Sequence, residues 1–465
     1  MAAAWGVWAE TESVSIVCGG SRHWMLLASR IDPDRTSGGL CTAKYVRLLA
    51  ELGVEVGLIY GEEGVEEGKL SALFAGVRSQ AVDVGVGNAG LLHSVAATLD
   101  AGVRNGSGRR WICGKIQAFF SFTSGFGAAD WVKFRRWQGT LERFGREADL
   151  VFAFGAGMDF TPHMALASRD WGVPWVAYYH DPWPGHLYPE PYRWQWSIPG
   201  WHQEGWHRKI LARAPALAFP SERLMRWVLC GELERYREKA FILPHLAWSW
   251  VDTDVEGKDG ELPEDFQPRL FHVVHAGNLL RHRSPWALLE GFQKFIGESA
   301  DKKAHARLWL LGGVDRHLQA DARWRDLLTH PAVRVIPERM SYAAALRMQA
   351  RASVAVIVEA IARESPFFPG KLADLLALRK AILAITPPQS TVRDLLGEDY
   401  PLLCLPDNTE MVASALEKAW VAWQGGRSHE LAAPENAVQA ASREAAIRQI
   451  GGLVEFLQRR TVREH

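Results

Sequence analysis

Two charged side chains stand at the start of an expected helix in the stretch RESPFFPGKLADLLALRKAILAI, Arg363–Ile385. Lys371 follows Gly370 directly, and Asp374 comes three residues later, so both lie on one face of the helix. The N-terminus of a helix offers unpaired N–H groups and the positive end of its dipole, and both suit a phosphate group. Lys371 would add a cation there, and Asp374 could accept hydrogen bonds from a ribose. The alternative is an ordinary β-loop-helix-β unit with a surface Lys–Asp pair.

A second basic segment follows an expected buried strand in the same half of the chain. The segment GNLLRHRSP, Gly277–Pro285, carries Arg281 and Arg283 in the loop that leads into the next helix. Because the planar donor fork of arginine matches phosphate oxygens, these two side chains and Lys371 could together surround a diphosphate. Two arginines in a loop are also commonly just solvated, so the segment alone does not define a site.

In the first half of the chain, a histidine and an aspartate end an expected strand. The run WVAYYHDP, Trp175–Pro182, finishes on His180 and Asp181. Ligands bind beyond the C-terminal ends of strands in open parallel sheets, which makes this pair a candidate site. Gly38 and Gly39 precede an expected helix and would let a phosphate or a hydroxylated ligand approach the backbone. The alternatives are a histidine with structural hydrogen bonds and a plain tight turn at the glycines.

Other chemistries have no matching pattern in the sequence. The Asp-x-Asp triplets at 32–34 and 252–254 lie in a turn-rich loop and an acidic segment, so we expect neither to hold a metal ion. His272 and His275 lack a third ligand for zinc. The sequence contains neither a Gly-x-Ser-x-Gly elbow nor a Walker-type phosphate loop, and it lacks the glycine pattern of nicotinamide-binding domains after its first expected strand.

Apolar runs and turn residues predict an α/β fold with two halves. In the first half, strands at Val14–Gly20 and Glu55–Gly61 flank a glycine loop and a helix, which is a βαβ unit of a parallel sheet. The second half alternates strands and helices throughout, which predicts a doubly wound sheet. Its strands are expected at Leu270–Gly277, Arg307–Gly313, Val333–Glu338, Val354–Ala360, Ala381–Ile385 and Leu402–Pro406, and its helices at Pro285–Ile296, Ser341–Arg351, Lys371–Arg379 and Thr409–Trp423.

The same pattern predicts the division into domains. Residues 1–250 would form an N-terminal Rossmann-like domain, 251–268 an acidic linker and 269–430 a C-terminal Rossmann-like domain. A final helix, about Asn436 to Gln458 within 431–465, follows the last strand and has no strand of its own to serve, so we expect it to pack back on the N-terminal domain. Its apolar stripe consists of Ile447, Ile450, Val454 and Leu457.

Composition limits the classes of partner and compartment. Of the 465 residues 48% are hydrophobic, and the formal net charge is zero, which argues against binding of nucleic acid. The five scattered cysteines suit a reducing cytosol. No stretch approaches the roughly 20 apolar residues of a membrane span, and the N-terminus lacks a signal peptide, so we expect a cytoplasmic protein. A basic amphipathic helix at 131–146 and the aromatic segment Pro182–Trp206 leave peripheral contact with the cytoplasmic face of a membrane open.

Segments of both halves resemble motifs of the GT-B glycosyltransferases, most closely the retaining family 4, also called glycosyltransferase group 1. AGNLLRHRSPWALLEGF is similar to that family's glycine-Arg/Asn-Leu segment, and FFPGKLADLLALRKAILAI to its PxKLxEYLAxGxPVLA segment. Lys371 then matches the family's lysine, and Asp374 stands where its ribose-binding glutamate usually is. SGGLCTAKYVRLLAELGVEV resembles the N-terminal Gly-Gly loop and helix, and His180 lies where the family has its active-site histidine.

The resemblance implies two doubly wound Rossmann-like domains that face each other across a cleft, with the C-terminal helix crossing back to the first domain. It implies transfer of a sugar from a nucleotide-sugar donor to an acceptor hydroxyl with retention and without a metal or cofactor. The acceptor would be a glycan, a glycolipid or another carbohydrate or lipid-linked precursor of a polysaccharide. His180, Asp181 and Glu364 would be catalytic, and Gly38 and Gly39 would face the acceptor. The donor would be bound by Gly277, Asn278, Arg281, Arg283, Phe367, Phe368, Gly370, Lys371, Leu372 and Asp374.

The sequence departs from that family at its Glu-x7-Glu motif. The first glutamate would fall on Pro366, and Glu364 is out of register. Asp374 is one methylene shorter than glutamate, and Asn278 and Arg283 replace the family's Arg–Lys pair. Two other functions therefore stay open: a nucleotide-sugar epimerase of the same fold and a catalytically inactive nucleotide-binding subunit. A membrane scaffold would rest only on the basic helix and the aromatic segment.

Overall fold

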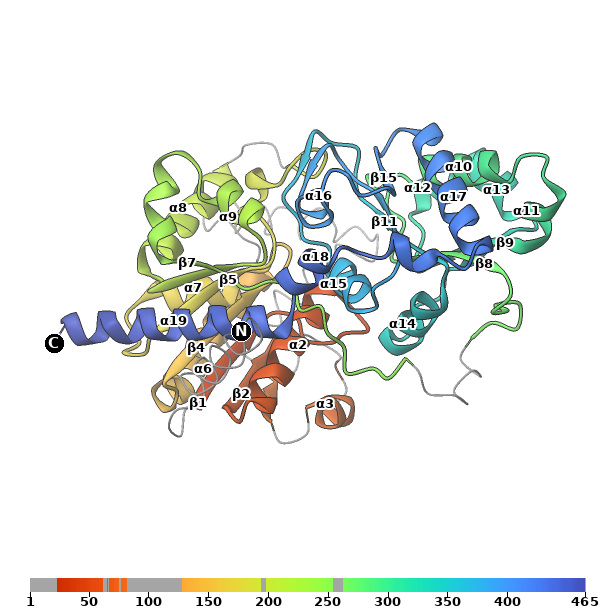
Figure 1. Ribbon diagram of the computed structural model, residues 1–465. Coiled ribbons are helices and arrows are strands. Elements are labelled where there is room, and N and C mark those ends of the chain that lie inside the picture. Colours follow the sequence, from red (N-terminus) through yellow and green to blue (C-terminus); the bar gives the residue numbers. More distant parts are fainter. Residues whose placement is uncertain are drawn as a thin grey trace. The chain divides into compact units, whose positions relative to one another are not determined.

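The computed structural model describes residues 23–61, 65, 67–74, 77–81, 128–193, 198–253 and 262–464. The chain divides into two compact units (Figure 1). Unit 1 consists of Met1–Tyr188, Arg193–Pro244 and Glu444–His465, and unit 2 of Pro189–Tyr192 and His245–Arg443. Of the expected acidic linker, residues 254–261 lie outside the described part, and the remainder belongs to unit 2.

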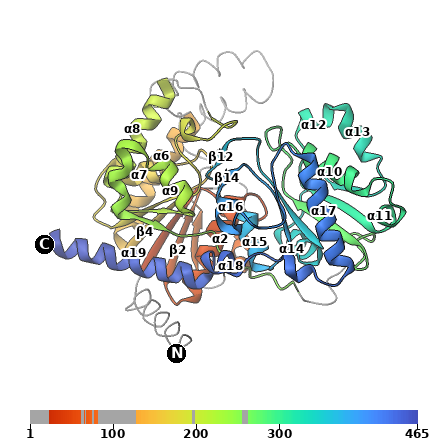
Figure 2. The ribbon, with the colours of Figure 1, turned by 45° about the horizontal axis from the view of Figure 1, so that its top comes forward.

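Unit 1 is built on a parallel sheet of seven strands in the order β3-β2-β1-β4-β5-β6-β7. Figure 2 labels two of these strands, β2 and β4. The central strands β4 and β5 are buried along their whole length, as expected for a parallel sheet covered on both faces. The strands are β1 (His23–Ala28), β2 (Glu55–Tyr60), β3 (Arg78–Ala81), β4 (Leu150–Gly155), β5 (Trp175–Tyr179), β6 (Ala216–Phe219) and β7 (Ala240–Ile242).

The first βαβ unit differs from the prediction in its first strand. The predicted strand Val14–Gly20 lies outside the described residues, and the strand that pairs with β2 is β1, whose residues from Trp24 to Ala28 are buried. The short run HWMLLA was overlooked because it begins with a polar histidine and a bulky tryptophan. The helix that follows, α2 (Ser37–Glu51), begins at the predicted glycine loop.

Unit 1 has six further α-helices among the described residues. They are α3 (Glu67–Leu73), α6 (Ala128–Phe144), α7 (Thr161–Ser168), α8 (Ile198–Arg213), α9 (Glu222–Val228) and α19 (Arg443–Glu464). In α6, which corresponds to the predicted basic amphipathic helix, Phe134, Trp137 and Leu141 are buried in the core. The apolar stripe of α6 is therefore used for packing within unit 1. None of the described helices has the length and hydrophobicity needed to cross a lipid bilayer.

Unit 2 contains a parallel sheet of six strands in the order β10-β9-β8-β11-β13-β15, which confirms the doubly wound pattern. All six strands coincide with the predicted segments: β8 (Phe271–Ala276), β9 (Ala306–Leu311), β10 (Val333–Ile336), β11 (Val354–Val358), β13 (Ile382–Ile385) and β15 (Leu403–Cys404). The four predicted helices are α10 (Trp286–Ile296), α14 (Tyr342–Arg351), α15 (Gly370–Ala377) and α17 (Thr409–Gln424). Shorter elements are α11 (Ala300–His305), α12 (Arg316–Ala320), α13 (Ala322–Leu328), α16 (Thr391–Leu396), α18 (Glu435–Ala440) and the strand pair β12 (Glu364–Ser365) and β14 (Gln389–Ser390).

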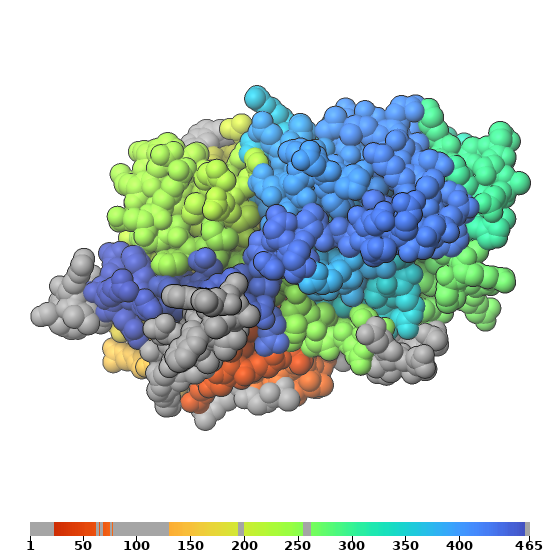
Figure 3. All heavy atoms as spheres, in the orientation of Figure 1, coloured from red at the N-terminus to blue at the C-terminus, as the bar shows by residue number. Residues whose placement is uncertain are grey.

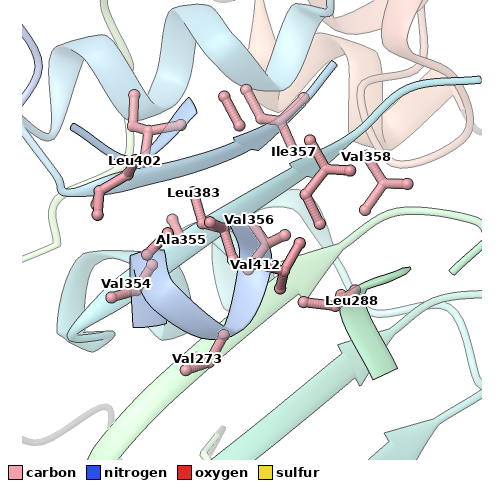
Figure 4. Close-up of a cluster of buried hydrophobic side chains, with 14 of the residues drawn as sticks. Val273, Leu288, Val354, Ala355, Val356, Ile357, Val358, Leu383, Leu402 and Val412 are labelled. Atoms are coloured by element: carbon pink, nitrogen blue, oxygen red, sulfur yellow. The ribbon is translucent and has the colours of Figure 1, made fainter. Parts of the chain in front are cut away.

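Close packing of α10 and α17 on the sheet forms the core of unit 2. Leu288 of α10 and Val412 of α17 lie in one buried cluster with Val273, Val356 and other residues of the central strands (Figure 4). A Cβ atom on Gly291 would come within 2.6 Å of a methyl carbon of Val412, so only glycine permits this approach of the two helices. This core holds β8 and β11, whose C-terminal ends carry the site described below.

The C-terminal segment forms two helices, where the sequence predicted one helix from Asn436 to Gln458. The helix α18 ends at Ala440, and α19 begins at Arg443. Figures 1 and 3 show α19 lying along unit 1, and Phe456 of α19 contacts Phe241 of β7 with ring centroids 5.5 Å apart. The residues of α19 that are buried are Ala446, Ile450, Gly451, Leu453, Val454 and Leu457.

We predict that Leu453→Ala lowers the free energy of unfolding by about 2–5 kcal/mol, since this fully buried side chain would leave a cavity. Gln458→Ala, an exposed position of the same helix, should change it by less than about 0.5 kcal/mol. Chemical denaturation followed by tryptophan fluorescence measures both. Equal stability of the two variants would show that α19 contributes little to unit 1.

Candidate functional site

The chain reverses direction across the sheet of unit 2 between β8 and β11. From β8 it continues to β9 on one side, and from β11 to β13 on the other. At such a point the loops beyond the C-terminal ends of the two strands diverge, and open α/β sheets bind ligands there. Gly277 follows β8 directly, and Glu359 follows β11 directly. Some of the predicted donor-binding residues, Lys371 and Arg283 among them, lie near these two positions.

Gly277 brings the loop after β8 close to a lysine amine. Its φ angle of +148° is one that L side chains rarely adopt, and a Cβ atom here would lie 2.5 Å from Lys371 Nζ. The backbone N–H of Gly277 donates to Leu311 O at 2.7 Å. Next to it, the side-chain oxygen of Asn278 accepts from the Gly313 N–H at 3.1 Å, so Asn278 fastens the loop after β8 to the loop after β9.

Lys371 lies in the first turn of α15, as predicted. Pro369 precedes the helix, and no side chain caps its N-terminus. Burial, followed by repulsion from Arg283, lowers the pKa of Lys371 to about 7, against the attraction of Glu359. Within the described residues the side-chain amine of Lys371 has neither an ion pair nor a hydrogen bond. A desolvated cation without a partner is costly, and it marks a position where an anion would be stabilised.

Arg283 is the second cation at this site. Its Nε–H donates to the hydroxyl of Tyr192 at 3.2 Å, and no described carboxylate lies within ion-pair distance of it. A backbone bridge between Leu280 and Arg283 closes the loop that carries it. Arg281, which the sequence grouped with Arg283, is exposed. The structure thus brings Arg283, and not Arg281, to the lining of the pocket described below.

Glu359 was not recognised in the sequence, where it looked like the polar end of the strand VAVIVEA. It is almost completely buried, with 6% of its surface exposed. Its carboxylate accepts from Ser365 Oγ at 2.6 Å and from the hydroxyl of Thr386. Burial raises the pKa of Glu359, while these hydroxyls, Arg283 and Lys371 oppose the rise. A lone charged residue at the end of an apolar strand was the available signal.

A small, partly open pocket lies beside these groups. Its lining combines a cation, three carboxylates and two aromatic rings. Glu364 and Phe367, both predicted site residues, belong to it. Pro366 does not, because its position is used structurally: its carbonyl accepts from Thr391 Oγ1 at 3.1 Å. The lining residues are Pro189, Glu190, Tyr192, Arg283, Glu359, Ala360, Ala362, Glu364, Ser365, Phe367 and Pro387.

Three further predicted residues have structural contacts. Asp374, the expected ribose ligand, is buried, and its Oδ1 accepts from the hydroxyl of Tyr342 at 2.8 Å. Phe368 is buried against the ring of His245, with centroids 4.9 Å apart. Leu372 lies in the core. Contact of Asp374 with a ribose therefore stays a prediction.

The predicted residues of the first half come together at the C-terminal edge of the sheet of unit 1. Asp181 accepts from the Gly157 N–H at 2.8 Å. A Cβ atom on Gly38 would lie 2.7 Å from Ala156 Cβ and 3.8 Å from the ring of His180. Gly38 is therefore packed between these two residues.

The second glycine is held by the start of α2. A Cβ atom on Gly39 would lie 2.5 Å from Asp32 O, and the Gly39 N–H donates to Thr36 Oγ1 at 2.9 Å. Lys69 forms ion pairs with Asp32 at 2.6 Å and with Asp34 at 2.8 Å. Both carboxylates of this Asp-x-Asp triplet are thus paired with one lysine.

No protein-family model matches the chain, and no curated protein matches it in sequence. Solved structures match it over nearly its whole length. Sucrose-phosphate synthase from Thermosynechococcus elongatus covers 95% of this chain and 99% of its own, with a TM-score of 0.56 and 13% identity. Trehalose 6-phosphate synthase from Burkholderia multivorans covers 96% and 100%, with a TM-score of 0.56 and 12% identity. Anabaena HepE in complex with UDP covers 95% and 100%, with a TM-score of 0.53 and 12% identity.

These neighbours are GT-B glycosyltransferases, and at such identities the likeness concerns the fold. The chain therefore has the GT-B fold that its motifs predicted.

We predict that Lys371→Met stabilises the free protein at pH 7. The pKa of Lys371 is about 7 in the folded state against 10.5 for a free lysine, so between these values the unfolded chain holds a proton that the folded protein has released. The wild type therefore loses stability as the pH falls from 10.5 to 7. The advantage of the variant should be greatest at and below pH 7 and shrink as the pH rises.

Unfolding curves of both proteins at several pH values measure this difference. Lys294→Met, which removes an exposed partner of Glu410, serves as the control and should show no such pH dependence. A constant difference between Lys371→Met and the wild type across this range would contradict the lowered pKa.

Proposed function

We propose that the chain is a retaining glycosyltransferase, which moves a sugar from a nucleotide-sugar donor to an acceptor hydroxyl. The observation that carries the proposal is the pair Lys371 and Arg283, two cations without a carboxylate partner among the described residues. They stand at the strand ends of β8 and β11 and the uncapped start of α15. A structural lysine or arginine in such a place would normally be paired, so the site is suited to a ligand with several negative charges.

A nucleoside diphosphate fits this chemistry. Arg283 uses Nε for Tyr192, which leaves its two Nη groups for phosphate oxygens. The amine of Lys371 and the N–H groups of the first turn of α15 would bind the remaining oxygens. The complex of Anabaena HepE with UDP supports this class of donor. The GT-B fold itself supports glycosyl transfer, as the sucrose-phosphate and trehalose-phosphate synthases with the same fold carry it out.

The proposed reaction breaks the bond between the anomeric carbon and the β-phosphate oxygen. Negative charge then grows on the leaving diphosphate, where Arg283, Lys371 and the helix N-terminus would stabilise it without a metal ion. The acceptor hydroxyl attacks from the same face and gives its proton to the leaving phosphate oxygen, so the configuration is retained and no protein nucleophile is required. Glu359 and Glu364 provide carboxylates at the pocket, although Pro366 replaces the glutamate of the family motif.

Unit 1 would supply the acceptor side. Gly38 and Gly39 lie at the start of α2, and a Cβ atom on Gly38 would lie 3.8 Å from the ring of His180. A hydroxylated acceptor, either a carbohydrate or a lipid-linked sugar, would be oriented there by His180 and Asp181. A screen of nucleoside diphosphates and nucleotide sugars by thermal shift tests the proposal. A bound ligand at about 100 times its Kd adds about 2.7 kcal/mol to the stability of the native state, whereas no shift with any of them would refute donor binding.

We expect Lys371→Ala and Arg283→Ala each to weaken binding of the nucleoside diphosphate by about 1.5–3 kcal/mol, the range for charge-assisted hydrogen bonds. Isothermal titration calorimetry measures the affinities. Lys294→Ala, at an exposed lysine of the same unit, should leave them unchanged. Unchanged affinity in both site variants would mean that the diphosphate is bound elsewhere.

His180→Ala should reduce turnover by about 100-fold or more, since it removes a positioned polar group, and should leave nucleoside-diphosphate affinity within a few-fold. Release of the nucleoside diphosphate from the donor found in the screen reports turnover. His163→Ala is the matched control: this buried histidine, 3.1 Å from Tyr178 O, should cost stability and not activity per folded molecule. If His180→Ala instead loses stability and keeps its activity per folded molecule, as expected for His163→Ala, then His180 has a structural role.

A further inference from the structure

Four residues from the aromatic segment between β5 and α8 belong to unit 2. The segment Pro189–Tyr192 is grouped with His245–Arg443, although the chain on either side of it belongs to unit 1. Three of its residues, Pro189, Glu190 and Tyr192, line the pocket. The wall of the pocket is thus completed by residues far from Arg283 in the sequence: Tyr192 and Arg283 are 91 positions apart.

The ring of Tyr192 is held between two aromatic neighbours of unit 2. Phe367 meets it edge to face, with centroids 6.0 Å apart and an interplanar angle of 84°. His282 does the same at 5.6 Å and 81°. Such contacts contribute about 0.5–1.5 kcal/mol each and restrict the ring, so the position of its hydroxyl is well defined.

That hydroxyl accepts the Nε–H of Arg283 at 3.2 Å, which is the only hydrogen bond of the Arg283 side chain within the described residues. A guanidinium is planar, so one bond to Nε fixes the plane in which both Nη groups lie. These two groups form the fork that binds two phosphate oxygens at once. Without the bond, the long side chain would sample several rotamers and would lose that freedom on binding.

We infer that Tyr192 is a positioning residue for donor binding: its hydroxyl orients the guanidinium of Arg283 so that both Nη groups face the diphosphate. This inference rests on the proposed function and extends it to a residue that no motif identifies. It assigns to the segment Pro189–Tyr192 a part in nucleotide affinity. The competing explanation is that Tyr192 only fills space between Phe367 and His282.

Tyr192→Phe separates the two explanations, because phenylalanine keeps the ring contacts and removes only the hydroxyl. We expect UDP, or the diphosphate that the screen identifies, to bind about 3- to 10-fold more weakly to this variant by calorimetry, with an unchanged melting temperature of the free protein. The double variant Tyr192→Phe/Arg283→Ala should bind no more weakly than Arg283→Ala alone, because the hydroxyl acts through the arginine.

The control is a second double-mutant cycle, which combines Tyr192→Phe with Lys371→Ala. Tyr192 has no hydrogen bond with Lys371, so the losses from Tyr192→Phe and Lys371→Ala should multiply. Two results would overturn the inference and leave the proposed function intact. One is that Tyr192→Phe binds the diphosphate as tightly as the wild type. The other is that Tyr192→Phe causes the same loss of affinity in the Arg283→Ala variant as in the wild type. Failure of the wild type itself to bind any nucleoside diphosphate would overturn both.

Discussion

The site of unit 2 is built around one unfavourable contact: the amine of Lys371 is held close to Gly277 and has no ion-pair partner among the described residues. The amine can come so near only because position 277 has no Cβ atom and a φ angle of +148°. Burial then lowers the pKa of Lys371 to about 7. The fold provides the free energy for this arrangement through the dry packing of β8 and β11 under α10 and α17. A ligand with negative charge would relieve the cost, so affinity is gained where stability is lost.

The second feature of this site is the carboxylate of Glu359. It stands at the end of β11, close enough to influence Lys371 and Arg283, yet it forms an ion pair with neither. Hydroxyls of Ser365 and Thr386 satisfy it instead. Satisfied by neutral donors, it leaves both cations available for a ligand. Had it been bonded directly to Lys371, a diphosphate would have to break a buried ion pair before binding.

The sequence was sufficient for what depends on local pattern. All six strands of the parallel sheet of unit 2 were predicted, because each is a short apolar run between turns, whereas the two-residue strands β12 and β14 were not. Lys371 was placed at a helix start because it follows Gly370 directly in the chain. Tyr192 was missed because it meets its partner Arg283 across 91 residues. Glu359 was missed because it looked like the polar end of an apolar strand. The break between α18 and α19 was also missed, since the sequence Ala441-Ser442 contains no proline or glycine. Asp374 was assigned to a ribose from its spacing, which could not reveal the bond to Tyr342.

The path of the chain has a consequence for biosynthesis. All of unit 2 except four residues lies between β7 and α19 of unit 1, as an insertion within the other unit. On a ribosome the seven-stranded sheet is made first, but the helix with buried Leu453 follows only after some 200 further residues, the stretch His245–Arg443. Unit 2 can therefore complete its core before α19 is synthesised, while the apolar surface of unit 1 that α19 covers is still exposed. During this interval chaperones would bind that surface or early aggregation would begin.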